Sequence, residues 1–115
     1  MKVRELARLL NARALTGEAG MDNEIQSGYC CDLLSWVMAH GGEGMAWVTV
    51  QTHMNVIAVA ALHDMSCVVI PKGAAMDEEV CRKAAEEGVA VLSSDKNAFE
   101  ISGILYKGGV PAGRQ

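Results

Sequence analysis

The sequence of 115 residues lacks a lysine or arginine cluster, and it lacks an apolar run long enough to cross a bilayer. Its longest apolar run covers only residues 56–62. Ten basic residues stand against fourteen acidic ones, which gives a net charge of −4 and disfavours binding to nucleic acid or to an anionic membrane. Residues 1–6 mix charged and apolar side chains instead of forming the apolar stretch of a signal peptide. These absences predict a cytoplasmic protein that binds neither nucleic acid nor membranes.

Cysteine is also sparse and has no metal-binding spacing. The four cysteines are an adjacent pair, Cys30 and Cys31, and two isolated residues, Cys67 and Cys81. No CxxC pair is present, so neither a zinc site nor a dithiol redox site is expected. We predict reduced, buried thiols, no metal and no cofactor. No nucleotide-binding loop with the required glycine and lysine spacing is found between a predicted strand and helix.

Half of the residues are apolar, and they alternate between strand-like runs and helical patterns. The expected helices are 2–11, 33–40, 55–62, 77–87 and 96–106, and the expected strands are 14–15, 25–29, 46–50, 66–70 and 89–92. Consecutive βα units with apolar strands predict a small three-layer α/β domain with a mostly parallel sheet, preceded by an N-terminal helix. One domain is expected over residues 1–110, followed by a flexible tail over 111–115. Trp36 and Trp47 are expected in its core, and helix 55–62 is expected to be buried on more than one face.

Four predicted strands each run into a turn that carries polar or small residues before the next helix. In a parallel sheet these turns meet at the carboxyl ends of the strands, where such folds bind ligands. Helix N-termini attract anions there, and Lys72 and Lys96 are the cations of these turns. The candidate ligand-binding residues are therefore Gln51, Thr52, His53, Asn55, Lys72, Gly73, Ser93 and Ser94.

Several of these side chains have simpler roles open to them. Thr52 is also a suitable N-cap for the helix that follows it, and Asp32 is expected to cap the helix after the first turn. His53 fits a ligand contact, a proton carrier or a structural residue. His40 and His63 stand at predicted helix ends, where a histidine can bond to free carbonyl groups.

Two long segments resemble those of the DRTGG domain family. Residues 28–40 read GYCCDLLSWVMAH, which is similar to the family's G-Y-x-x-D-L-L-S-x-V-M-A segment. Residues 47–56 read WVTVQTHMNV, which is similar to its W-x-T-x-Q-x-H-x-N-x turn. The resemblance spans about residues 1–108 and departs from the family at 71–73, where Pro-Lys-Gly replaces Thr-Gly-Gly.

The resemblance implies an α/β domain that dimerises and acts as a regulatory module. Relatives are attached to CBS-domain pyrophosphatases and phosphotransacetylases, and the fold is similar to the non-catalytic N-terminal domain of HPr kinase/phosphorylase. We therefore predict a non-catalytic, ligand-sensing homodimer that binds a small anionic ligand or nucleotide at the carboxyl ends of its strands. The alternative is an adaptor that docks on a redox (hydrogenase-like) or acyl-transfer enzyme without a small ligand. A small enzyme that uses His53 as an acid–base group ranks last, since no second catalytic group is evident.

Overall fold

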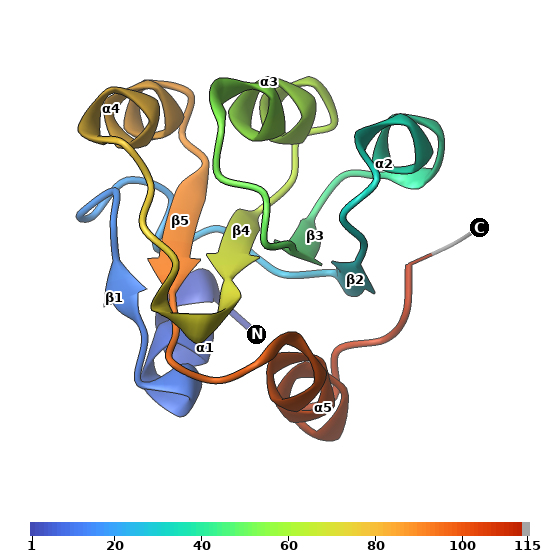
Figure 1. The fold of residues 1–115 in the computed structure, drawn as a ribbon. Coiled ribbons are helices and arrows are strands. Elements are labelled where there is room, and N and C mark those ends of the chain that lie inside the picture. The colour runs from blue at the N-terminus through green and yellow to red at the C-terminus, as the bar shows by residue number, and fades with distance from the viewer. Residues whose placement is uncertain (114–115) are drawn as a thin grey trace.

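Five short strands form one sheet in the order β1-β5-β4-β3-β2, as a computed structural model describes it for residues 1–113 (Figure 1). The strands are β1 (Arg13–Ala14), β2 (Ser27–Cys30), β3 (Met45–Val48), β4 (Cys67–Ile70) and β5 (Ala90–Ser93). β2 to β5 are parallel, and β1 adds to β5 in the antiparallel sense.

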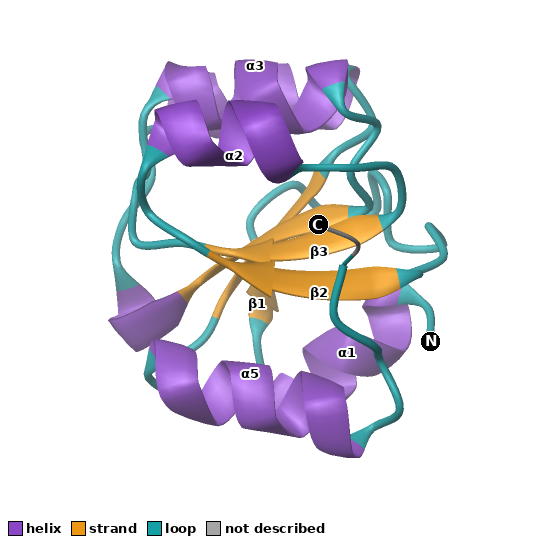
Figure 2. Cartoon of the chain, turned by 90° about the vertical axis from the view of Figure 1, so that its right-hand side faces the viewer, coloured by secondary structure: helices purple, strands orange, loops and turns teal. Residues whose placement is uncertain are grey.

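Helices cover both faces of this sheet. α2 (Leu34–His40), α3 (Met54–Leu62) and α4 (Glu78–Glu86) lie over one face, while α1 (Val3–Leu10) and α5 (Ala98–Lys107) lie over the other (Figures 1 and 2). A short 3₁₀ turn, η1 (Pro71–Gly73), follows β4. The three-layer α/β prediction is confirmed. In the described part of the chain, no helix is both long enough and apolar enough for a membrane crossing.

The core is divided between the two faces of the sheet. Every residue of β3, β4 and β5 is buried. Alternate side chains point to opposite layers, so Trp47 packs under α2 and α3 while Ala46 and Val48 face α1 and α5. Burial on both faces explains why these strands read as continuous apolar runs in the sequence.

The segment after α5 is hydrogen-bonded to the edge strand β2. Gly28 donates its N–H to the Pro111 carbonyl at 2.9 Å, and Gly113 donates to the Gly28 carbonyl at 3.3 Å. Ala112 forms a parallel bridge with Gly28. The prediction of a flexible tail from residue 111 therefore does not hold for 111–113, because the edge strand β2 offers unpaired backbone groups that this segment satisfies. Residues 114–115 lie outside the described residues.

The two tryptophans occupy opposite environments. Trp47 is fully buried, and its indole N–H donates to the Cys31 carbonyl at 2.8 Å. Trp36 is 52% exposed and stacks at a tilt on His40, with the ring centroids 4.3 Å apart. The prediction that both belong to the core was wrong for Trp36, because the short helix α2 buries only Val37.

Helix α3 contacts the sheet with one side only. Val56, Ile57, Val59 and Ala60 are buried, whereas Leu62 is 68% exposed on the outer side. The expectation that this helix is buried on more than one face is therefore wrong. As the middle helix of its layer, α3 is flanked by α2 and α4, and nothing within residues 1–113 covers its outer side (Figure 1).

The contrast between the tryptophans is testable by substitution. Trp47→Phe should lower the free energy of unfolding by about 1–3 kcal/mol, because it leaves a void and removes the donor to the Cys31 carbonyl. Trp36→Phe should change it by no more than about 0.5 kcal/mol. Urea unfolding of both variants measures this, and equal effects would contradict the assigned environments.

Candidate functional site

The carboxyl ends of β2 and β3 are joined by one carboxylate. Asp32 Oδ1 accepts hydrogen bonds from the Thr49 hydroxyl at 2.8 Å and from the Val50 N–H at 2.9 Å. Gln51 completes the connection, because its side-chain amide donates to the Asp32 carbonyl at 3.2 Å and its N–H donates to Thr49 Oγ1 at 3.2 Å. Bonds to an ionised acceptor are strong, so this network fixes the turn after β3.

This network corrects the expected role of Asp32. The N-cap of α2 is Leu33, and no side chain caps that helix. The Asp32 carboxylate instead takes the two donors offered by the neighbouring turn. Asp32 and Thr49 were therefore missed as site-forming residues, because their pairing depends on the register of β2 beside β3.

The turn after β3 leads directly into α3. Gln51 and Thr52 are half-buried, while His53 and Asn55 are exposed. The N-cap is His53 and not Thr52, and no side chain caps the helix. No acidic residue lies in the first turn of α3. The positive end of the helix dipole is therefore accompanied by polar side chains of α3 and its N-cap that include no carboxylate.

The turns after β4 and β5 separate to opposite faces of the sheet, since β4 leads to α4 and β5 leads to α5 (Figure 1). Such a divergence between neighbouring parallel strands is where open α/β sheets form their ligand crevice. Here backbone hydrogen bonds link the two turns. Lys72 donates its N–H to the Lys96 carbonyl at 2.9 Å, and Gly73 donates to the Ser94 carbonyl at 2.7 Å.

The two serines at the carboxyl end of β5 are part of the packing. Ser93 and Ser94 are both buried. Ser94 Oγ accepts the Lys96 N–H at 3.2 Å and lies 3.5 Å from the Leu10 carbonyl. The Lys96 ammonium also donates to the Leu10 carbonyl, at 3.4 Å, so this cation interacts with the end of α1. The Lys72 side chain, by contrast, is exposed.

All eight candidate residues thus lie at one edge of the sheet, but in two groups. Gln51, Thr52, His53 and Asn55 surround the start of α3, while Lys72, Gly73 and Ser94 belong to the linked turns after β4 and β5, and Ser93 is the last residue of β5. Their role in ligand binding stays a prediction.

The other two histidines end helices, as predicted. His40 Nδ1 lies 3.0 Å from the Trp36 carbonyl oxygen. The His63 ring connects two helices, with Nδ1 3.0 Å from the Val59 oxygen and Nε2 3.0 Å from the Met38 oxygen. His63 therefore holds the C-terminal ends of α2 and α3 together.

The cysteines are free thiols in different environments. Cys67 is fully buried in β4, and burial raises the pKa of its thiol to about 12. Cys31 and Cys81 are half-buried, and Cys30 is exposed, which corrects the expectation that all four are buried. Within residues 1–113, no three histidine, cysteine, aspartate or glutamate side chains are grouped so that they could hold a metal ion.

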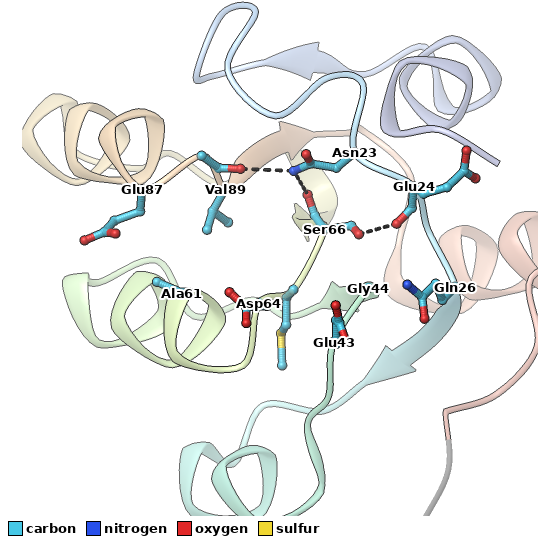
Figure 3. A pocket seen from close by; sticks show the side chains of 12 residues that line it. Asn23, Glu24, Gln26, Glu43, Gly44, Ala61, Asp64, Ser66, Glu87 and Val89 are labelled. Atoms are coloured by element: carbon cyan, nitrogen blue, oxygen red, sulfur yellow. Dashed lines mark hydrogen bonds between the residues drawn. The ribbon is translucent and has the colours of Figure 1, made fainter.

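A cavity of about 380 Å³ opens at the opposite edge, at the amino ends of the strands. Figure 3 shows the carboxylates around it; they belong to Glu24, Glu43, Asp64 and Glu87. Asn23 connects its walls by donating to the carbonyls of Ser66 at 3.1 Å and Gly88 at 3.0 Å, and the Ser66 hydroxyl donates to the Glu24 carbonyl. No lysine, arginine or histidine lines this cavity, so its charge opposes an anionic ligand.

Comparison with known proteins identifies the family. The DRTGG domain family matches residues 5–107. The chain belongs to this family. A similar solved structure contains the CBS and DRTGG domains of the regulatory region of a Clostridium perfringens pyrophosphatase, complexed with its activator, diadenosine tetraphosphate. It aligns with a TM-score of 0.69 at 12% identity over 90% of this chain, and this chain covers 45% of its length. No curated protein matches the chain.

The DRTGG domain is therefore part of a regulatory region in that pyrophosphatase, and at 12% identity the likeness shows a shared fold. In the present chain, the departure at 71–73 has a structural consequence. Lys72 adopts a left-handed backbone with φ of 59°, at a position where the family pattern has glycine. A side chain in this conformation is strained, and glycine is not.

Replacing this lysine should reveal the strain. Lys72→Gly is expected to raise the free energy of unfolding by up to about 1 kcal/mol, since the left-handed penalty exceeds the entropy that glycine adds to the unfolded chain. Lys72→Val should lower it, because a β-branched residue tolerates this conformation poorly. Urea unfolding of the pair measures the difference, and the reverse order would refute the strain.

Thiol labelling should separate the cysteines. At pH 8 in the folded protein, iodoacetamide should modify Cys30 and leave Cys67 unmodified, because a pKa of about 12 keeps the buried thiol protonated. Peptide mass spectrometry measures each site, and the chain unfolded in urea should label at all four cysteines. Equal native labelling of Cys67 and Cys30 would contradict the burial.

Proposed function

We propose that this DRTGG domain is a non-catalytic, homodimeric regulatory module that binds a small anionic ligand, a nucleotide or phosphometabolite, at the carboxyl ends of its strands. The start of α3 carries this proposal. It combines a helix N-terminus without an acidic first turn or a side-chain cap with the polar side chains of Thr52, His53 and Asn55. Free N–H groups at such an end donate hydrogen bonds to phosphate or carboxylate oxygens.

The neighbouring turns add groups that fit a nucleotide in particular. Lys72 supplies an exposed positive charge on the turn after β4, the strand beside β3. The exposed Asp32 carboxylate receives both of its hydrogen bonds on Oδ1, which leaves Oδ2 to accept from a ligand hydroxyl. A nucleotide carries phosphates that can pair with the Lys72 ammonium, and it carries ribose hydroxyls that can donate to the Asp32 carboxylate.

Two further observations support this class of ligand. The acidic cavity at the amino edge disfavours anions, so the carboxyl edge is the better place for one. The regulatory region of the similar pyrophosphatase, which contains a DRTGG domain, binds a nucleotide activator. The net charge of −4 and the composition are the basis for the predicted cytoplasmic location.

Thermal unfolding in the presence of ligands tests the proposal. AMP, ATP, diadenosine tetraphosphate, acetyl phosphate and orthophosphate are added separately to the full chain. At a hundredfold excess over Kd, a ligand should stabilise the fold by about 2.7 kcal/mol, or roughly 10 °C in Tm. Thr52→Ala and Lys72→Gly should reduce the shift, because they remove a polar contact and the exposed charge.

Arg82→Gln is the matched control, since it removes an exposed cation from α4 and should leave the shift unchanged. No shift with any of these ligands would refute the ligand-binding proposal. If Thr52→Ala and Lys72→Gly show the same ligand-induced shift in Tm as the wild type, the ligand binds elsewhere on the domain.

The alternative function is an adaptor for a redox or acyl-transfer enzyme. It is supported by an apolar groove of about 420 Å³ between α3 and α4, lined by Met54, Ile57, Ala58, Ala61 and Leu62 beside Lys83 and Glu87. This alternative predicts no response to nucleotides or phosphates. It also predicts that Leu62→Glu abolishes the complex with the partner enzyme while the fold, measured by circular dichroism, is retained.

A further inference from the structure

The outer side of α5 presents two large aromatic side chains to solvent. Ile101 and Leu105 are buried against the sheet, whereas Phe99 and Tyr106 are 87% and 76% exposed on the opposite side. α5 is an outermost layer of the domain, on the face that it shares with α1 (Figure 2). Exposed apolar side chains that share one side of a helix are typical of a surface that another molecule covers.

Gly103 lies between these aromatic residues, in the middle of α5. Glycine weakens a helix more than any residue except proline. A Cβ atom built at Gly103 meets nothing within 4 Å, so no contact inside the domain requires its small size. The missing side chain instead leaves a notch on the outer side, where a second helix can approach closely.

The residues around this notch are arranged symmetrically. Phe99 stands four residues before Gly103 and Tyr106 three residues after it, which is about one helical turn in each direction. When two copies of α5 cross antiparallel at Gly103, Phe99 of one copy therefore lies against Tyr106 of the partner subunit. Aromatic pairs of this kind stabilise interfaces beyond the area that they bury.

The charges of α5 follow the same symmetry. Glu100 and Lys107 are exposed, three residues before and four residues after Gly103. The antiparallel crossing places Glu100 opposite Lys107 of the partner subunit, and a two-fold axis forms this pair twice. A parallel crossing would instead place like charges together. The charge pattern thus favours a second copy of this chain in one orientation.

We propose that α5 forms an isologous dimer interface, with two antiparallel copies crossing at Gly103. The inference rests on the proposed homodimer and identifies its face. The domain measures 33 × 30 × 23 Å, which gives the face of α1 and α5 room for the ~800 Å² per partner of a standard interface. The exposed side of α3 is the rival face, but α3 has no charged residue to set an orientation.

Sedimentation velocity of the full chain over a concentration series tests the proposal with Gly103→Leu. Leucine is a far better helix former than glycine, so this variant should unfold at the same or a higher temperature than the wild type. Its side chain fills the notch and should convert the dimer into a monomer. Leu62→Ser, on the outer side of α3, is the control and should remain dimeric.

Charge exchange provides the second test. Glu100→Lys and Lys107→Glu should each weaken the dimer about tenfold, because each substitution acts twice across the axis. The double variant restores opposite charges across the crossing and should recover the wild-type dimer constant. The substitutions also change how charges near the ends of α5 interact with the helix dipole, which alters the stability of the fold. Thermal unfolding of all three variants, followed by circular dichroism, measures this effect separately from dimerisation.

Each outcome has a distinct meaning. A wild type that is monomeric at every concentration overturns both this interface and the proposed homodimer, while ligand binding is judged by its own thermal titration. A dimer that persists in Gly103→Leu and in both single charge variants overturns the α5 interface alone. Dissociation in Leu62→Ser instead assigns the interface to α3.

Discussion

The burial of both faces of a short parallel sheet is the constraint on which the rest of this structure depends. Every residue of β3, β4 and β5 is buried, so these central strands serve as packing surface, and Ser93 at the end of β5 is the one candidate ligand-binding residue among them. Polar groups are confined to the turns at the strand ends, and apolar helices are needed on each side. Because the helices form single layers, their outer sides face solvent and supply the surfaces available to other molecules.

The two edges of the sheet consequently differ in charge and in construction. At the amino edge, four carboxylates surround a cavity whose walls Asn23 holds together. At the carboxyl edge, the turns after β4 and β5 are linked through backbone N–H groups, which removes those donors from ligand binding. The turn after β3 is held by the Asp32 carboxylate instead, and the adjoining N-terminus of α3 has no capping side chain. At this one edge, the turns after β4 and β5 therefore use their backbone donors on each other, whereas the N-terminus of α3 keeps donors free for a ligand.

The sequence predicted the layers and the sheet, because apolar runs and helical periodicity report directly on burial. It also located the candidate residues at the carboxyl edge, since that placement follows from the order of βα units. It failed where a contact depends on neighbours that are distant along the chain. The local sequence around Asp32 predicts a helix cap, and only the pairing of β3 with β2 shows that its carboxylate bonds to the next turn. The spacing of Trp36 predicts a core residue, and only the packing of α2 shows that this helix buries Val37 alone. The acidic cavity is lined by residues from four separate segments of the chain, so no local sequence pattern predicts it.

The position of β1 has a consequence for the order in which the chain folds. β2, β3, β4 and β5 are neighbours in both sequence and sheet, so each βα unit can add to the one before it. β1 instead pairs with the last strand, where Arg13 lies opposite Ser93, and Leu10 receives bonds from Ser94 and Lys96. Closing so long a loop is slow, and it comes after the local pairings have formed. During synthesis on the ribosome, α1 can bond early to residues 18–25, but its end and β1 should gain their bonds to β5 and the following turn only when nearly the whole chain has emerged.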